Sequence, residues 1–178
     1  MGTKRHTRQI WADLPVGDGV RGVTVGDAWE LCGWMFKGYI HAVKVTSGRQ
    51  CAVAAAMLGC LILTAPLLWP VMAGMICMPG RYGWRTDTAA LFIAKRRNHW
   101  LLDTHLSRNP GTGQGAVLRD AVVPQLKAAA THEGTPVRFV PADPRLLARY
   151  TRDAGTVTAS TRNIIGQRAS EWAPPGHG

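Results

Sequence analysis

The chain has 178 residues, enough for one domain of ordinary size with a small appendage. Lysine and arginine number 21 against 11 acidic residues, so the net charge is +10, while hydrophobic residues reach 46% and charged residues only 18%. This composition excludes a disordered acidic chain, a collagen and a coiled coil, and four cysteines are too few for a disulfide-dense scaffold.

A basic N-terminal arm, residues 1–26, precedes an expected helix. Asp27 is placed to cap a helix that runs to about Val45. Apolar residues share one face of this helix at helical spacing: Trp29, Cys32, Phe36, Ile40 and Val43. Polar residues share the other face: Glu30, Lys37, His41 and Lys44. Because its aromatic residues are of the kind that favours the headgroup zone, we expect residues 27–50 to form an amphipathic helix at a membrane interface.

Residues 51–79 form a hydrophobic block. No charged residue occurs between Arg49 and Arg81, and about 20 apolar residues are enough for a helix to cross the bilayer core. Pro66 and Pro70 lie within the block, and each removes a backbone donor and kinks a helix. Two arrangements therefore stay open: a single kinked transmembrane span, or a re-entrant hairpin of two half-helices that turns near Pro66. A core helix of a soluble protein is disfavoured because the run has no polar face.

Basic residues after the block indicate the topology. Five cations follow it within about twenty residues, against Asp87 alone: Arg81, Arg85, Lys95, Arg96 and Arg97. By the positive-inside rule, this cluster predicts a cell-membrane protein whose C-terminal part is cytoplasmic, with the lipid bilayer as a partner. The preference for arginine over lysine suggests a bacterial source.

Residues 88–168 are predicted to form a mixed α/β unit. A strand over residues 89–96 turns at Arg97–Asn98 into a partner strand over residues 99–107. The later elements are a glycine-rich turn, a helix over 116–131 that Pro124 should kink or split, a strand over 136–141, a helix from Asp143 to Gly155, and a strand over 157–160. The order is strand, strand, helix, strand, helix, strand, and residues 169–178 form a loose tail.

The glycine-rich turn is an anion-binding signal. Gly111, Gly113 and Gly115 stand where a strand leads into a helix. Free backbone N–H groups and the helix dipole attract phosphate at such a place, and glycine lets the phosphate approach the backbone. A Walker A loop would need Lys-Ser/Thr after its last glycine, where Ala116 stands. A dinucleotide fingerprint would need an acidic residue at the end of the next strand, and the sequence has none there.

From His99 to Gly155 the chain resembles the GNAT superfamily of N-acetyltransferases. In that family a strand runs into a Gln/Arg-x-x-Gly-x-Gly/Ala loop at the start of a long helix, and the loop amides hold the pyrophosphate of acetyl-coenzyme A. Two registers are open. The run from Arg108 to Gly113 matches literally, whereas Gly113 and Gly115 match the family's usual run into the helix and put Pro110 at the Gln/Arg position. The resemblance implies these residues for the acetyl-coenzyme A site: Arg108, Gly111, Thr112, Gly113, Gln114, Gly115 and Ala116.

The resemblance also implies a catalytic acid. Tyr150 resembles the tyrosine of the family's Tyr-x-x-x-Gly-Phe helix ending, which protonates the departing thiolate; here Gly155 is one residue farther on and Thr156 replaces the aromatic residue. Asp103 and His105 alternate onto one face of the strand before the loop, so either is a candidate for the base that deprotonates the acceptor.

Together these features predict a membrane-anchored, acetyl-coenzyme A-dependent N-acyltransferase with an unidentified amine acceptor. The family's first strand and two early helices, which shape the acceptor site, have no clear counterpart in the sequence. A non-catalytic membrane protein that keeps a degenerate GNAT-like domain for partner binding is therefore the alternative. No metal is expected, because the cysteines form no Cys-x-x-Cys pair and the histidines are scattered. Nucleic acid is disfavoured as a partner, since attraction to anionic lipid explains the basic residues as well.

Overall fold

The structure is a computed structural model that describes residues 19–139, 157–162 and 168–174. Its elements are β1 (Arg21–Gly22), a 3-10 turn η1 (Val25–Asp27), α2 (Ala28–Val45), α3 (Gly48–Leu63), α4 (Ala65–Cys77), β2 (Arg81–Arg85), β3 (Ala89–Lys95), β4 (Trp100–Ser107), α5 (Gly115–Glu133), β5 (Val137–Phe139), β6 (Val157–Arg162) and β7 (Arg168–Trp172).

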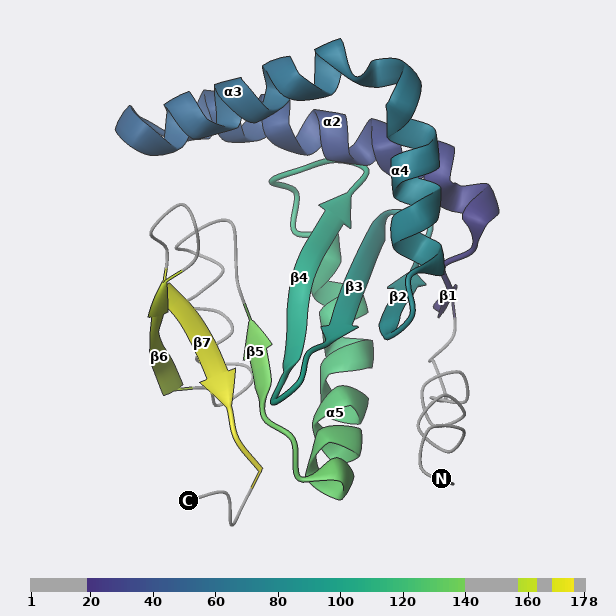
Figure 1. Cartoon of the computed structure of the whole chain (residues 1–178), viewed down its shortest axis with the longest axis vertical. Coiled ribbons are helices and arrows are strands. Elements are labelled where there is room, and N and C mark those ends of the chain that lie inside the picture. Colours follow the sequence, from purple (N-terminus) through teal and green to yellow (C-terminus); the bar gives the residue numbers. More distant parts are fainter. Residues whose placement is uncertain (1–18, 140–156, 163–167, 175–178) are drawn as a thin grey trace.

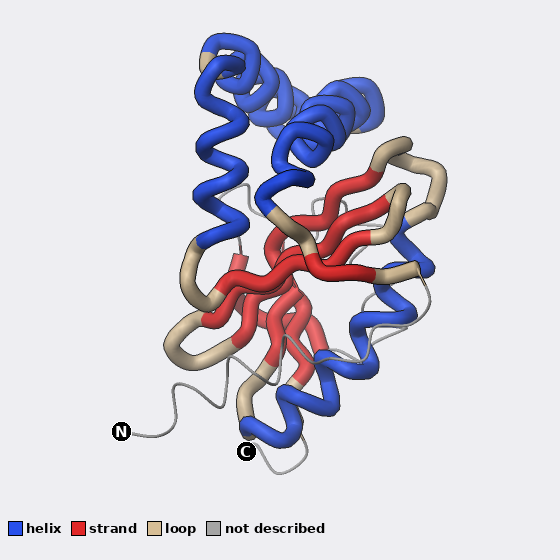
Figure 2. The backbone as a smooth tube through the Cα atoms, turned by 90° about the vertical axis from the view of Figure 1, so that its right-hand side faces the viewer, coloured by secondary structure: helices blue, strands red, loops and turns tan. Residues whose placement is uncertain are grey.

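The described strands form one sheet in the order β1-β2-β3-β4-β5-β7-β6 (Figure 1). Neighbouring strands are antiparallel except β4 and β5, which are parallel. Parallel neighbours need a crossover, and α5 provides it. Figure 2 shows α5 on one face of the sheet and the three earlier helices on the other.

Each face of the sheet has its own hydrophobic core. On the α5 face, Leu118 and Leu126 pack on Leu91, Ile93 and Trp100. On the opposite face, α2 and α4 pack on the sheet through this set: Leu31, Trp34, Met72, Ala90, Phe92 and Leu106. The first six residues of β3 are all buried, because its apolar run supplies side chains to both cores. The α5 helix continues through Pro124, which is exposed on its surface.

An ion-pair network fixes the start of α2. The Asp27 carboxylate accepts hydrogen bonds from Arg21 (2.6 Å), Arg85 (2.7 Å) and the Thr24 amide (2.8 Å). Arg85 is buried, lies over the Trp34 ring and also pairs with Glu30 at 2.8 Å. The helix spans Ala28–Val45, in agreement with the bounds expected from the sequence, and this network ties it to β1 and β2.

The hydrophobic block forms α3 and α4. No single helix of the described residues is long and apolar enough to cross a membrane; α3 and α4 pass that test only as a pair, and the pair is bent by 101°. The bend falls at Thr64, directly before the first turn of α4, where Pro66 lies. A proline suits a first turn because its missing N–H has no intrahelical partner there.

The block is built into the domain, which corrects the sequence analysis. The sequence analysis found no clear counterpart of the family's first strand and early helices, and read the segment before residue 88 as a separate anchor. The structure instead has β1 and the three helices α2, α3 and α4 before β2. Met72 of α4 is fully buried against the sheet, so this helix belongs to the core. A helix that packs on a sheet and a membrane segment can both be long, apolar and free of charge, so composition alone does not distinguish them.

Candidate active site

The strand that leads into the glycine loop carries a bulge. Phe92 of β3 pairs with Thr104 and Ile93 pairs with Leu102, so Asp103 is an extra residue in β4. Leu102 packs in the α5 core, and His105, which pairs with Leu91 of the same core, faces that side too. The sequence analysis expected Asp103 and His105 to share a face by regular alternation. The bulge shifts the alternation after Leu102 and turns His105 toward α5, while the side chain of Asp103 lies outside the described residues.

The end of β4 stands apart from β5. The two strands pair only from Trp100 to Leu102 on the β4 side. Figure 1 shows the remainder of β4 continuing past β5 toward α2 and α3. Among the described residues, the segment 103–107 therefore has a paired strand only on its β3 side. The glycine loop begins where this segment ends.

The loop from Asn109 to Gly115 contains backbone N–H groups that lack an acceptor among the described residues. Gly111 and Gly113 have φ angles of 86° and 79°, in the left-handed region that favours glycine. Within the loop, the Thr112 hydroxyl donates to the Asn109 carbonyl at 2.8 Å, and the Ala116 amide donates to the Gly113 carbonyl at 2.9 Å. No acceptor among the described residues takes the amides of Gly113, Gln114 or Gly115. Within the described part of the chain, these three N–H groups are therefore unpaired at the positive end of the α5 dipole.

His105 lies directly against the start of α5. A Cβ atom on Gly115 would overlap Nε2 and Cε1 of the His105 ring, so only glycine fits there. Burial lowers the pKa of His105 to about 4, and the nearby Arg119 charge adds to this effect. The imidazole is therefore neutral near pH 7. Its Nε2 atom is buried and has no hydrogen-bond partner among the described residues, and the same holds for Oε1 of Gln114.

His41 of α2 is a site residue that sequence reasoning missed. A Cβ atom on Gly111 would lie 2.8 Å from Cε1 and 3.1 Å from Nε2 of His41. The ring therefore lies over the first part of the loop, on the other side from His105. The sequence analysis placed His41 on the polar face of an interfacial helix, and no local pattern links a residue of α2 to the loop.

The remaining predicted site residues have different positions. Arg108 is exposed, and its amide donates to the Thr88 carbonyl at 2.8 Å, which ties the start of the loop to the β2–β3 turn. Thr112 is exposed and Ala116 is half-buried in the first turn of α5. Tyr150 lies outside the described residues. The structure thus gathers the loop residues, His105 and His41 at the end of β4, while the acid assigned by resemblance stays a prediction.

The sequence matches no protein-family model and no curated protein. Solved structures match most of its length. PaiA N-acetyltransferase from Thermoplasma acidophilum, in complex with coenzyme A, is 11% identical with a TM-score of 0.58, over 86% of this chain and 97% of that chain.

The fold is that of the GNAT N-acetyltransferases. Two further structures agree. A GCN5-related N-acetyltransferase from Rhodopseudomonas palustris is 15% identical with a TM-score of 0.56, over 86% of this chain and 94% of that one. A GNAT-family acetyltransferase from Staphylococcus aureus Mu50 is 10% identical with a TM-score of 0.52, over 86% and 97%. A match over 86% of the chain includes more than residues 88–168, so the GNAT fold takes in part of the segment before β2.

Proposed function

We propose that this protein is an acyl-coenzyme A-dependent N-acyltransferase, with acetyl-coenzyme A as donor and an unidentified amine as acceptor. The observation that carries the proposal is the glycine loop. Its three free amides, at Gly113, Gln114 and Gly115, begin the helix that follows β4 in a GNAT fold. A structural neighbour with this fold is bound to coenzyme A.

The loop fits a pyrophosphate on structural grounds. The free amides would donate hydrogen bonds to its oxygens, and the dipole of α5 would favour its negative charge. The missing Cβ atom at Gly113, where no other atom lies within 4 Å of its place, leaves the backbone open to the ligand. The buried Nε2 of His105 and Oε1 of Gln114, which lack partners among the described residues, lie beside the same turn. His41 would close the loop from the α2 side.

Acetyl-coenzyme A would supply an acyl group as a thioester: the amine nitrogen bonds to the acyl carbon, the carbon–sulfur bond breaks, and the sulfur takes a proton. Orientation of the two reactants by the protein would supply much of the acceleration. Neutral His105 has the protonation state of a base, but a pKa of about 4 makes it a weak one near pH 7. Its place against Gly115 favours a role in supporting the loop. Asp103, at the bulge, is the other candidate base, and we assign the acid role to Tyr150.

Two glycine variants test the donor site. Gly113 and Gly134 both have positive φ angles, 79° and 63°, and a Cβ atom at either would meet no other atom within 4 Å. Alanine therefore adds the same backbone strain, about 1–2 kcal/mol, at both positions. Gly134 only ends α5, whereas a methyl group at Gly113 would stand where the pyrophosphate binds. We expect Gly113→Ala to weaken binding of coenzyme A at least tenfold in calorimetry, and Gly134→Ala to leave it unchanged. Equal affinities would refute the assignment.

We further propose that the corner between α3 and α4 rests on a lipid bilayer, with the acyl-transfer site on the cytoplasmic side. Large apolar side chains are exposed at this corner, including Leu63 at 85% and Leu67 at 60%. The charge-free run from residue 50 to residue 80 contains them all. The 101° bend disfavours a single span, and Met72 of α4 is buried against the sheet, so we limit the proposal to surface contact at the corner.

Vesicle flotation tests the membrane proposal. Leu63→Glu puts a charge at the most exposed apolar position of the corner, where burial in lipid is unfavourable. Val117 is an exposed apolar residue of α5, on the opposite face of the sheet, so Val117→Glu is the matched control. The wild-type chain and the control should float with vesicles that contain anionic lipid, and Leu63→Glu should not. A wild-type chain that stays unbound would refute the proposal.

A further inference from the structure

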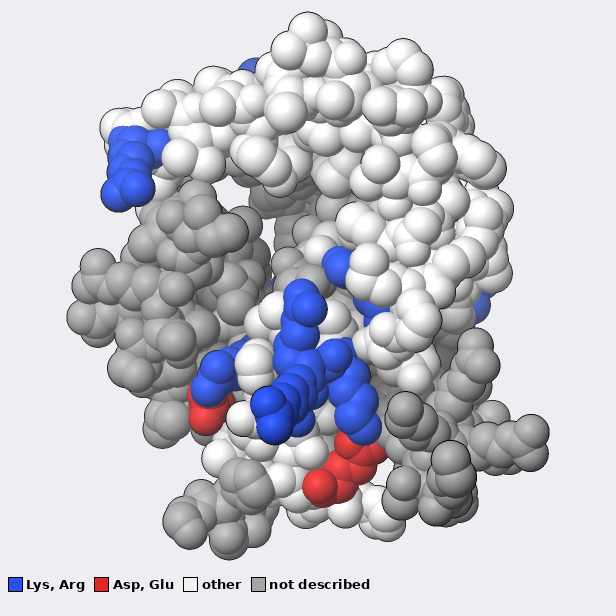
Figure 3. Space-filling model, in the orientation of Figure 1, with Lys and Arg blue, Asp and Glu red and all other residues white. Residues whose placement is uncertain are grey.

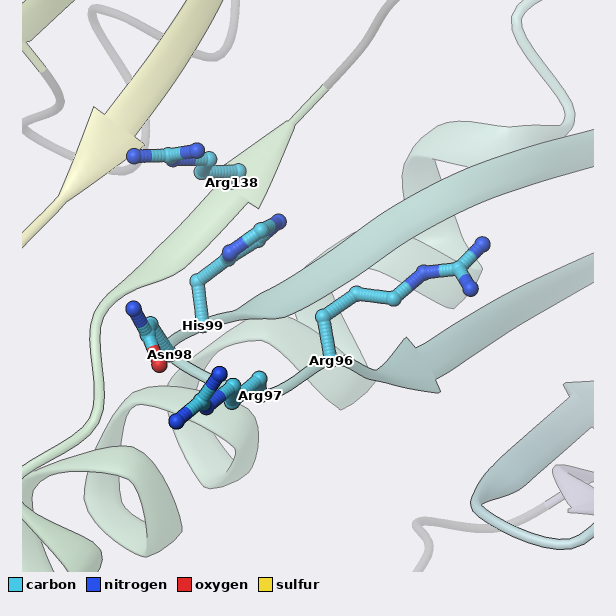
Figure 4. Close-up of a pocket in the computed structure, with 5 residues that line it drawn as sticks. All are labelled: Arg96, Arg97, Asn98, His99 and Arg138. Carbon is cyan, nitrogen blue, oxygen red and sulfur yellow. The ribbon is translucent and has the colours of Figure 1, made fainter.

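A basic pocket lies at the other end of β4 from the glycine loop. The turn Arg96–His99, between β3 and β4, and Arg138 of β5 line a cavity of about 400 Å³ (Figure 4). The eight residues of β4 separate this turn from the loop, a distance of roughly 26 Å along the strand. The pocket is therefore distinct from the proposed donor site.

Positive charge in and beside this basic pocket exceeds negative charge. Lys95 pairs with Glu133 at 3.2 Å, and Arg138 pairs with Glu171. Arg96 and Arg97 are exposed, and neither has an ion-pair partner among the described residues. Figure 3 shows a cluster of Lys and Arg side chains at the lower centre of this face, with acidic side chains at its margin. In the part of the chain that the structure describes, these two guanidinium groups thus have no carboxylate that forms an ion pair with them.

Polar groups complete the lining. In Figure 4, His99 rises from the turn toward Arg138, and Asn98 precedes it in the turn. Burial lowers the pKa of His99, and the Arg138 and Arg96 charges act in the same direction, while Glu171 opposes them. Neutral His99 and the Asn98 amide each offer a hydrogen-bond donor without adding charge. The lining thus combines guanidinium groups with neutral donors, which is the chemistry that recognises phosphate oxygens.

We propose that this basic pocket binds a compact polyphosphate anion, such as the diphosphate or triphosphate part of a nucleotide or an inorganic polyphosphate. Its volume falls in the range of small-ligand sites. Arg96 of the turn and Arg138 of β5 point in different directions (Figure 4), so linked phosphates meet more of the cations than a single phosphate does. Trp100, the nearest aromatic residue in sequence, is fully buried and offers no face for stacking a base.

Two macromolecular ligands fit the surface less well. A nucleic acid strand needs a basic stripe along its path, and the cations that line this pocket, Arg96, Arg97 and Arg138, come from one turn and the neighbouring strand β5. A bilayer on the α3–α4 corner would lie at the opposite end of the molecule (Figure 1), so one flat membrane does not reach both places. A small, free anion is therefore the ligand that the geometry favours.

Calorimetry of the full chain with inorganic tripolyphosphate tests this proposal, in the presence of saturating coenzyme A so that the glycine loop does not compete. The test variant is Arg96→Gln with Arg97→Gln. The matched control is Lys44→Gln with Arg49→Gln, which removes the same charge from an exposed site at the far end of the molecule. We expect one saturable site in the wild-type chain that weakens as salt rises, at least a tenfold loss of affinity in the test variant, and a change below twofold in the control.

Three results would overturn the proposal. The first is no saturable binding by the wild-type chain at millimolar tripolyphosphate. The second is an equal loss in the test and control variants, which would show a general charge effect. The third is Arg96- and Arg97-dependent binding of a single-stranded RNA oligonucleotide without binding of tripolyphosphate, which would make the site a nucleic-acid contact. None of these depends on acyl transfer, because Gly113→Ala tests the donor site separately.

Discussion

The contact between His105 and Gly115 makes a stability prediction that needs no ligand. Gly115→Ala adds one methyl group, and that methyl group would overlap Nε2 and Cε1 of His105. Gly115 has no positive φ angle, so the backbone itself accepts alanine. The ring is the main obstacle, and removing the ring should remove the effect.

The expected magnitude follows from overpacking. An extra methyl group in a closely packed site destabilises by about 1–3 kcal/mol. In a His105→Ala background the same change should be neutral, or stabilising by up to about 1 kcal/mol because alanine favours the helix over glycine. The coupling energy between the two sites is then about 1–3 kcal/mol. For a chain of this size, each kcal/mol corresponds to roughly 2–4 °C in Tm.

Urea denaturation of the four proteins in this double-mutant cycle provides the assay. Gly33→Ala is the control, because Gly33 lies inside α2 and a Cβ atom there meets no other atom within 4 Å. It should be neutral or stabilising in both backgrounds. If Gly115→Ala destabilised the wild-type and His105→Ala proteins equally, the ring would not lie against the start of α5, and the described geometry of the site would be wrong.

Three other predictions concern single groups. The pKa of His105 in the folded chain lies below its unfolded value of about 6.5, because burial favours the neutral imidazole. The free energy of unfolding therefore falls as the pH drops below about 6.5. Between pH 7 and pH 5 it should fall by about 2 kcal/mol more in the wild-type chain than in His105→Gln, as measured by urea denaturation. Asp27→Asn removes one of the two carboxylates that pair with buried Arg85, Glu30 being the other, and should destabilise by about 1.5–3 kcal/mol at pH 7. Because Arg21, Thr24 and Arg85 hold the pKa of Asp27 far below its ordinary value, the Asp27 contribution is present above about pH 4 and fades in stronger acid, where the two proteins should converge in thermal melts. Tyr150→Phe should keep coenzyme A binding and lower thiol release from acetyl-coenzyme A by roughly 10²–10⁴-fold across an amine panel. Equal turnover by the variant and the wild-type chain would remove Tyr150 from the mechanism. Coenzyme A binding without any turnover by the wild-type chain would favour a non-catalytic, partner-binding domain.

Local features of the sequence predicted the centre of the fold well. The strand pair around Arg97–Asn98 appears as β3 and β4, because a turn between two apolar runs determines a hairpin. The glycine loop and the start of α5 also follow from local signals, since positive φ angles and a free helix end depend on neighbouring residues. These are the parts that carried the resemblance to GNAT proteins.

Features that depend on distant residues were not predictable in this way. The bulge at Asp103 arises from the pairing of β4 with β3, and it decides which core His105 faces. The approach of His41 to Gly111 requires the position of α2 relative to the loop. The hydrophobic block was ambiguous for a different reason: α4 buries Met72 against the sheet while α3 leaves most of its surface exposed, and beyond Arg49 in the first turn of α3 neither helix carries a charge.

Hydrogen exchange at the loop amides tests the central claim most directly. In the ligand-free protein, the amides of Gly113, Gln114 and Gly115 have no acceptor among the described residues, so they should exchange rapidly. Saturating coenzyme A should slow their exchange at least tenfold, while the amides of the Arg96–His99 turn keep their rates. Bound coenzyme A that left these three amides unprotected, or that protected only another part of the chain, would contradict the assignment of the glycine loop as the acyl-donor site.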